Sequence, residues 1–294
     1  MTWPHALYVA AALVALGLLF AVRIAVRSYL GERDDFVRSP SSYLSQHPAE
    51  AGIPDLGEIS FSGADHVRIA GWYAPSRNTA AIVIVHGTQA DRSALLLETK
   101  ILAEAGFGVL ALDLPGQGAS EGNTLWGAAE RRAISAAIDW LTTRGEVDPH
   151  RIGGFGHSMG AYILTQAAGL DRRIRAVMLS ASPSDVVEQN WWATSTWGLL
   201  SQLPTYWALR ASGMPLDMQP GDVVGTIAPR AVFILGGDLD DVVPVYMARQ
   251  LYQSAGEPKE LWIVHGAHHD DHARIAPHEY RTRLVEFFRR NLLN

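Results

Sequence analysis

A serine flanked by two glycines is the first feature of this sequence that could do chemistry. The pattern Gly-His-Ser-Met-Gly occupies residues 156–160, directly after the apolar run 152–155 and directly before an apolar helical pattern. A sharp turn from a strand into a helix leaves no room for side chains beside the serine, which explains the glycines. Such a turn exposes the serine hydroxyl and directs backbone N–H groups toward a developing oxyanion. We therefore predict that Ser158 is a nucleophile.

A second serine has the same glycine spacing. The pattern Gly-Ala-Ser-Glu-Gly occupies residues 118–122, but no apolar helix begins at Ser120, which lies in a glycine-rich loop. We therefore predict a structural role for Ser120. The glycines at 154 and 156 also allow a dinucleotide-binding turn, although the next predicted strand ends in Ser-Ala-Ser rather than in an acid that could bind a ribose.

A nucleophilic serine needs a general base, and the base needs a carboxylate that orients it. Both residue types follow later apolar runs that we predict to be strands. Three aspartates lie within residues 236–244, after the run 231–235, and four histidines lie within residues 265–272, after the run 261–264. The order serine, aspartate, histidine predicts a catalytic triad and leaves open which aspartate and which histidine belong to it.

The elements that must position these residues form an alternating pattern. Short β-branched runs predict strands at 81–85, 109–112, 152–155, 174–179, 231–235 and 261–264. Helical patterns lie between or after them at 126–143, 161–168, 246–255 and 279–292. This alternation predicts an α/β fold in which helices flank a mostly parallel sheet.

The motifs together resemble those of the α/β-hydrolase superfamily over residues 58–292. His-Gly-Thr at 86–88 resembles the oxyanion loop of that superfamily, and residues 113–120 resemble its Asp-x-x-Gly-x-Gly-x-Ser loop. The Gly-Trp-Tyr-x-Pro segment at 71–75, together with an apolar N-terminal run, resembles the membrane-anchored, Bem46-like branch. The Gly-His-Ser-Met-Gly pattern also resembles that of monoacylglycerol lipases and of serine peptidases with a similar fold. One departure is Arg230, which stands where relatives usually have an apolar residue.

The resemblance also implies which residues do the chemistry. The family pattern Gly-x-x-Asp-x-x-Val-Pro corresponds to Asp240, and Gly-x-x-His corresponds to His269. The backbone N–H groups of Thr88 and Met159 would form the oxyanion hole. The alternatives, which we expect to face solvent or to structure loops, are Asp238, Asp241 and His268.

The activity implied is cleavage of a carboxylic ester, including lipid acyl esters, through an acyl-enzyme, with no cofactor and no metal. A thioesterase or a serine peptidase would use the same triad. A membrane-tethered binding scaffold is the non-enzymatic alternative, because fold does not guarantee activity. A metal site is a further alternative, with its ligands drawn from His265, His268, His269, Asp270, Asp271 and His272.

A long interval between predicted strands indicates an insertion. About fifty residues separate the run ending near Ser180 from the run starting at Ala231, which is too many for one crossover helix. We predict a small helical cap over residues 183–228. Its tryptophans would line a pocket for an apolar small-molecule ester, or would instead pack the cap or contact the bilayer; they are Trp191, Trp192 and Trp197.

The N-terminus is predicted to anchor the protein in a membrane. Residues 6–26 are apolar apart from Arg23, and this run is long enough to cross a bilayer. We expect a single-pass anchor at 1–27, a tether at 28–57 and a hydrolase domain at 58–294. Arginines 23, 27, 33 and 38 lie at the C-terminal end of the apolar run or beyond it, so the positive-inside rule predicts that the domain is in the cytoplasm.

Composition excludes several other classes. The 294 residues include no cysteine, which excludes disulfides, thiolate metal sites and a cysteine nucleophile. The net charge is -6 and the basic residues are scattered, so we expect no nucleic-acid partner.

Overall fold

The computed structural model describes most of the chain after residue 47. The described residues are 48–53, 55–63, 66–124, 126–193, 206, 209–210 and 216–294. The predicted anchor at 1–27 and most of the predicted tether lie outside them. No helix in the described part of the chain combines the length and the apolar character needed to cross a bilayer.

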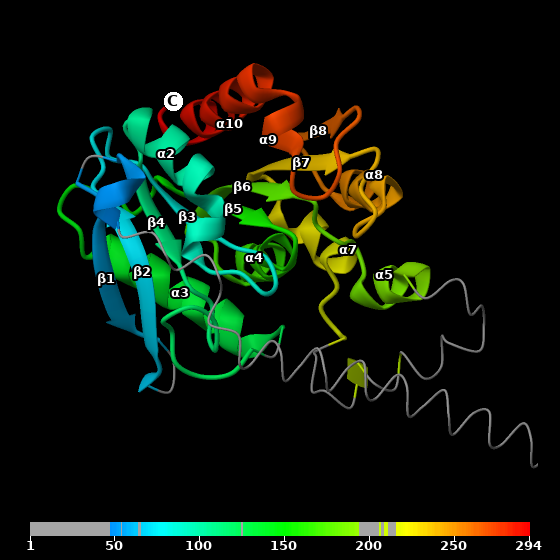
Figure 1. Ribbon diagram of the computed structural model, residues 1–294, viewed down its shortest axis with the longest axis horizontal. Helices are drawn as coiled ribbons and strands as arrows, with labels where there is room; N and C mark the ends of the chain where they lie inside the picture. Colours follow the sequence, from blue (N-terminus) through cyan, green and yellow to red (C-terminus); the bar gives the residue numbers. More distant parts are fainter. Residues whose placement is uncertain are drawn as a thin grey trace, which may run out of the picture.

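One eight-stranded sheet forms the centre of the described structure (Figure 1). Its strand order is β1-β2-β4-β3-β5-β6-β7-β8, with β1 and β2 antiparallel to their neighbours and the other strands parallel to one another. The strands are β1 (Gly57–Ser62), β2 (Arg68–Ala74), β3 (Ala81–Val85), β4 (Gly108–Leu112), β5 (Ile152–His157), β6 (Ile174–Ser180), β7 (Ala231–Gly237) and β8 (Lys259–Val264). The predicted α/β architecture is therefore confirmed.

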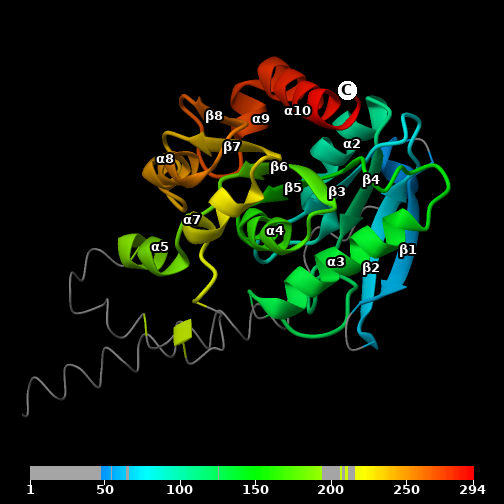
Figure 2. The same ribbon diagram turned by 180° about the vertical axis from the view of Figure 1, so that it is seen from behind.

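Helices cover both faces of this sheet (Figures 1 and 2). One face carries α2 (Leu96–Glu104), α9 (His272–Ile275) and α10 (Pro277–Leu292). The other face carries α3 (Ala128–Thr142), α4 (Met159–Leu170), α7 (Pro220–Val223) and α8 (Val245–Ser254), with α5 (Val186–Ala193) beyond them. Three short 3-10 helices complete the described elements: η1 (Pro48–Ala51), η3 (Arg92–Leu95) and η5 (Val224–Ile227).

Strand β3 shows why these residues form a central strand. All five of its residues are buried, because helices cover both faces of a parallel sheet. Successive side chains point to opposite faces, so Val83 and Val85 pack in one core while Ile82 and Ile84 pack in the other. Full burial of each such side chain stabilises the fold by about 1.5–3 kcal/mol.

Three apolar residues near the end of the predicted tether are buried. Ala51, Ile53 and Leu56, which we assigned to the tether, belong to the same buried core cluster as residues of α2 and α10. These residues follow the serine- and proline-rich stretch, and too few of them are apolar to produce a periodic pattern. The end of the predicted tether therefore belongs to the packed domain.

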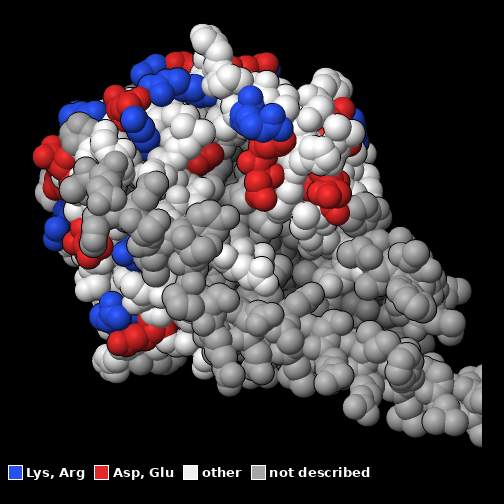
Figure 3. All heavy atoms as spheres, viewed as in Figure 1, with Lys and Arg blue, Asp and Glu red and all other residues white. Residues whose placement is uncertain are grey.

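Charged side chains are mixed on the described surface. On the face seen in Figure 3, Lys and Arg alternate with Asp and Glu over the described residues. This mixture agrees with the scattered basic residues of the sequence and offers no continuous basic field on that face.

Candidate active site

Ser158 lies in the sharp turn between β5 and α4. Its backbone has φ 54° and ψ −123°, a conformation that residues with a side chain rarely adopt. A Cβ added at Gly160 would lie 2.1 Å from the carbonyl oxygen of Val85, and one at Gly156 would lie 2.7 Å from backbone atoms of Ala161. Both flanking positions therefore require glycine, as the sequence indicated.

Ser158, His269 and Asp240 form a continuous hydrogen-bonded chain. The Oγ of Ser158 lies 3.0 Å from Nε2 of His269, and Nδ1 of His269 lies 2.8 Å from Oδ2 of Asp240. All three residues are buried. Because the carboxylate can only accept, Nδ1 carries the proton and Nε2 is free to accept the serine proton. This is the arrangement that a nucleophilic serine needs.

Asp240 is held by the backbone of its own loop. Its Oδ1 accepts hydrogen bonds from the N–H groups of Val242 at 2.9 Å and Val243 at 2.7 Å, which leaves Oδ2 to face His269. The side chain of Asp240 is only 1% exposed, so its bond to His269 is shielded from competing water. The loop after β7 therefore fixes the direction of the carboxylate.

The alternative aspartates and histidine lie elsewhere. Asp238 accepts hydrogen bonds from the backbone of Gly266 at 2.6 Å and from Nδ1 of His265 at 2.9 Å, and these bonds lower the pKa of its carboxyl group. Asp238 thereby joins the loops that follow β7 and β8. Asp241 and His268 are exposed to solvent.

The loop after β3 lies directly against the serine. A Cβ added at Gly87 would be 3.2 Å from Cβ of Ser158. Buried His86 fixes this loop: its Nε2 accepts a hydrogen bond from the N–H of Leu114 at 3.1 Å, so its Nδ1 donates to the carbonyl of Gly87 at 2.8 Å. Burial lowers the pKa of His86, which keeps the ring neutral for both bonds. Thr88 follows Gly87 in this loop and is partly exposed.

Met159 lies on the other side of the serine and begins α4, where backbone N–H groups lack partners within the helix. A substrate oxygen between the loop after β3 and the start of α4 would face both segments. The two backbone N–H groups predicted to form an oxyanion hole thus come from segments that meet at Ser158.

Ser120 is occupied by structural hydrogen bonds. Its Oγ donates to the carbonyl of Asp113 at 2.8 Å and accepts from the N–H of Ala70 at 2.9 Å. Asp113 itself is fully buried, forms an ion pair with Arg92 and accepts from the N–H of Ala119 at 2.7 Å. These bonds tie the loop after β4 to β2, and the Ser120 hydroxyl is already committed to them.

A second histidine–carboxylate pair, which sequence reasoning missed, adjoins the triad. Nε2 of His157 lies 2.8 Å from Oδ1 of Asp270, and its Nδ1 lies 3.2 Å from Oγ of Ser180. The ring of His157 is centred 5.0 Å from that of His269. The hydrogen bond from His157 lowers the pKa of Asp270. Since each residue adjoins a triad member in sequence, the pair ties the histidine loop to the serine turn.

His157 and Asp270 also belong to the one group of side chains, within the described residues, that could hold a metal ion. Potential ligand atoms of His157, His269 and Asp270 lie within 4.8 Å of one another, so these three side chains could hold a divalent ion. Of the candidates predicted from the sequence, only His269 and Asp270 belong to this group. His265 bonds to Asp238, while His272 is buried and has its pKa lowered to about 4, chiefly by burial.

The start of the predicted cap contacts the loop that carries Asp240. Nε2 of Gln189, in α5, donates to the carbonyl of Val242 at 3.1 Å. Oγ of Ser184 donates to Oε1 of Gln250, in α8, at 2.6 Å. Of the predicted pocket residues, Trp191 and Trp192 fall in α5 with side chains that are not described, and Trp197 lies outside the described residues.

Several known proteins are similar to this chain in sequence or in fold. The family model described as "Serine aminopeptidase, S33" matches residues 76–220. An uncharacterized protein of Mycobacterium tuberculosis is 29% identical over 251 residues, which cover 80% of this chain and 83% of that protein.

Solved structures share the fold. An esterase of Pyrococcus furiosus superposes with a TM-score of 0.72 at 21% identity, covering 84% of this chain and 95% of its own. An α/β-hydrolase from a Penicillium species superposes with a TM-score of 0.66 at 20% identity, covering 81% of this chain and 99% of its own. The chain therefore has the α/β-hydrolase fold, and its residues 76–220 are similar to the serine aminopeptidase family. These similarities support a hydrolytic enzyme, as its motifs predicted.

Proposed function

We propose that this enzyme cleaves carboxylic esters with a Ser158–His269–Asp240 triad. The observation that carries the proposal is the chain of two hydrogen bonds, 3.0 and 2.8 Å long, that joins the serine hydroxyl to the histidine and the histidine to the carboxylate. A buried chain of this kind makes a serine hydroxyl nucleophilic at neutral pH.

The reaction proceeds in two halves. Oγ of Ser158 attacks the ester carbonyl carbon while Nε2 of His269 takes the hydroxyl proton, and Asp240 stabilises the resulting imidazolium. The N–H groups of Thr88 and Met159 bind the oxyanion of the tetrahedral intermediate. The intermediate collapses to an acyl-serine as His269 returns the proton to the leaving alcohol. Water, deprotonated by His269, then attacks the acyl carbon. The bond from that carbon to Oγ of Ser158 breaks as His269 returns the proton to Oγ, and the acid is released.

An ester is the substrate class that we favour. The Pyrococcus furiosus protein of similar fold is named as an esterase, whereas the matching family model is described as a serine aminopeptidase. The triad serves ester, thioester and amide bonds alike, so the pocket decides between them. Hydrolysis of aminoacyl p-nitroanilides with no turnover of p-nitrophenyl esters would favour the peptidase alternative.

The cap at 183–228 is proposed to cover the site and to supply an apolar acyl pocket. The bond between α5 and the Asp240 loop supports this placement, because it fixes the beginning of the insertion beside the triad. The tryptophans at 191, 192 and 197 would contribute the apolar surface. A pocket of this kind suits a lipid acyl chain or another apolar ester.

The anchor at 1–27 is proposed to hold the catalytic domain at the cytoplasmic face of a membrane. The support is the apolar run 6–26 with arginines after it. Protease added outside intact cells should leave the domain whole, whereas protease added after lysis should digest it. Digestion in intact cells would show the opposite orientation.

Active-site labelling tests the nucleophile. A fluorophosphonate probe should label the wild-type protein and Ser120→Ala, but not Ser158→Ala. Ser120→Ala is the matched control, because it removes the same hydroxyl from the other Gly-x-Ser-x-Gly pattern. Labelling that survives Ser158→Ala and disappears with Ser120→Ala would assign the nucleophile to the other serine.

A further inference from the structure

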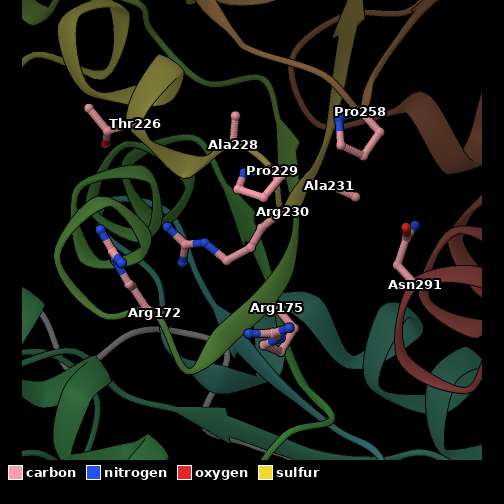
Figure 4. A pocket seen from close by; sticks show the side chains of 9 residues that line it. All are labelled: Arg172, Arg175, Thr226, Ala228, Pro229, Arg230, Ala231, Pro258 and Asn291. Atoms are coloured by element: carbon pink, nitrogen blue, oxygen red, sulfur yellow. The ribbon is translucent and has the colours of Figure 1, made fainter.

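A pocket of about 400 Å³ lies where strands β6, β7 and β8 begin, at the opposite end of these strands from the triad (Figure 4). The residues that line it come from the segments leading into β6, β7 and β8 and from the end of α10, and they are Arg172, Arg175, Thr226, Ala228, Pro229, Arg230, Ala231, Pro258 and Asn291. Strand β6 runs from this pocket at Ile174 to the site at Ser180. At ~3.3 Å per residue, the two sites are about 20 Å apart, so a ligand here would not contact the triad.

Three arginines gather at this pocket without carboxylate partners. Within the described part of the chain, no acidic side chain forms an ion pair with Arg172, Arg175 or Arg230. The nearby carboxylate of Asp171 is bound by Arg173, whose Nη2 lies 2.7 Å from it. Three positive charges in one hollow repel one another, and an anion would relieve that repulsion.

Arg230, the residue that departs from the family pattern, is held in place by the backbone. Its Nε donates to the carbonyl of Ile227 at 3.0 Å, and its Nη1 donates to the carbonyls of Asp171 and Ile174 at 3.0 and 2.9 Å. Its Nη2 makes no hydrogen bond to any residue that the structure describes. Burial and the charges of Arg172 and Arg175 lower the pKa of Arg230, consistent with an unrelieved positive cluster.

We propose that this pocket binds a phosphate group. A guanidinium presents N–H groups in a planar fork that matches phosphate oxygens, and a doubly charged anion neutralises several arginines at once. The fixed Arg230 would contribute a pre-oriented donor, while the exposed Arg172 and Arg175 would close on the other oxygens. The volume is in the range of small-molecule sites, so a phosphate monoester fits it.

Binding of inorganic phosphate to the full-length protein tests the proposal. Titration calorimetry at constant ionic strength, with chloride as the replaced anion, should show saturable binding. The double variant Arg172→Gln/Arg175→Gln should bind at least about tenfold more weakly, because it removes two of the three charges. Both residues are exposed, so the variant should fold, which its thermal unfolding will check.

The matched control is Arg249→Gln, which removes one exposed arginine from α8, outside the pocket lining. It should bind phosphate within twofold of wild type. Absence of saturable binding to the wild-type protein, or equal weakening in the double variant and the control, would overturn the proposal.

A separate variant, Arg230→Lys, keeps the charge and should bind more weakly than wild type, because Lys lacks the planar fork.

The source of the phosphate group can be distinguished with two probes. Glycerol phosphate presents the group in solution, and phosphatidic acid in detergent micelles presents it on a lipid. Unfolding midpoints should rise with either probe in the wild type and less in the double variant. A larger rise with glycerol phosphate at equal phosphate concentration identifies a soluble ligand, and a larger rise with phosphatidic acid identifies a lipid headgroup. No rise with either would count against the pocket.

Discussion

Two adjacent histidines occupy opposite environments in this enzyme. His269 is buried between Ser158 and Asp240, whereas His268 is exposed and uses its backbone N–H to bond Asp271. His269→Ala removes the proposed general base, so kcat for a p-nitrophenyl ester should fall ~10³-fold or more. His268→Ala should stay within about twofold of wild type. A loss of similar size in both variants would contradict the assignment of His269 as the general base.

His272 should make stability depend on pH. Its ring is buried, its Nε2 lacks a partner among the described residues, and its pKa is lowered to about 4. The titratable groups around it are His157, Asp240, His269 and Asp271. The unfolded state therefore takes up a proton near pH 6.5 that the folded state takes up only near pH 4.

The contribution of His272 is complete above pH 6.5 and is lost as the pH falls toward 4. We expect His272→Phe to remove up to about 3 kcal/mol of the pH dependence of the unfolding free energy over this interval. Urea unfolding of both proteins at several pH values measures the difference. Parallel curves for wild type and variant would contradict the lowered pKa.

At the scale of elements, the contact between β3 and α4 depends on a missing side chain. A Cβ at Gly160 would meet the carbonyl of Val85 at 2.1 Å, and backbone cannot move aside cheaply. Gly160→Ala should therefore lower the unfolding free energy by more than about 2 kcal/mol and also disturb the serine turn. Gly145→Ala is the control, because nothing lies within 4 Å of its added Cβ. Its stability should change by less than about 1 kcal/mol.

The parallel strands of the sheet were predictable from the sequence, and the antiparallel edge formed by β1 and β2 was not. Strands β3 to β8 all overlap predicted runs. Strands β3 to β7 are buried and largely apolar, and β8, although only half-buried, carries the apolar run 261–264. The hairpin of β1 and β2 was missed: β1 alternates between half-buried and exposed residues, and Gly71 interrupts β2. Helix α2 was also missed, since its apolar residues do not gather along one stripe.

Site residues that directly follow predicted strands could be located from the sequence. Contacts between side chains of different loops could not. The turn at Ser158 and the aspartate and histidine loops could be placed because parallel strands end at one edge. The pairing of His157 with Asp270 spans 113 residues and leaves no local pattern. The burial of His272 likewise depends on packing rather than on spacing. Such contacts become visible only once the loops are folded together.

At the scale of the whole molecule, the proposed cap should govern chain-length preference. Each methylene that enters an apolar pocket gains about 0.8 kcal/mol, which corresponds to at most about fourfold in kcat/KM. We expect kcat/KM for p-nitrophenyl esters to rise from acetate toward longer chains until the pocket is full. Trp191→Ala/Trp192→Ala should flatten this rise. A profile that is flat for wild type as well would leave the insertion without a role in acyl recognition.

The backbone conformation of Ser158 exposes the nucleophile but lowers the stability of the fold. A residue with a Cβ held at φ 54° raises the free energy of the folded state by roughly 1–2 kcal/mol, whereas glycine adopts this conformation freely. Ser158→Gly should therefore unfold at a higher temperature than Ser158→Ala, although neither variant turns over substrate. A glycine at position 158 would raise the stability of the fold but remove the nucleophile. Retaining the serine therefore keeps activity at the expense of some free energy of unfolding.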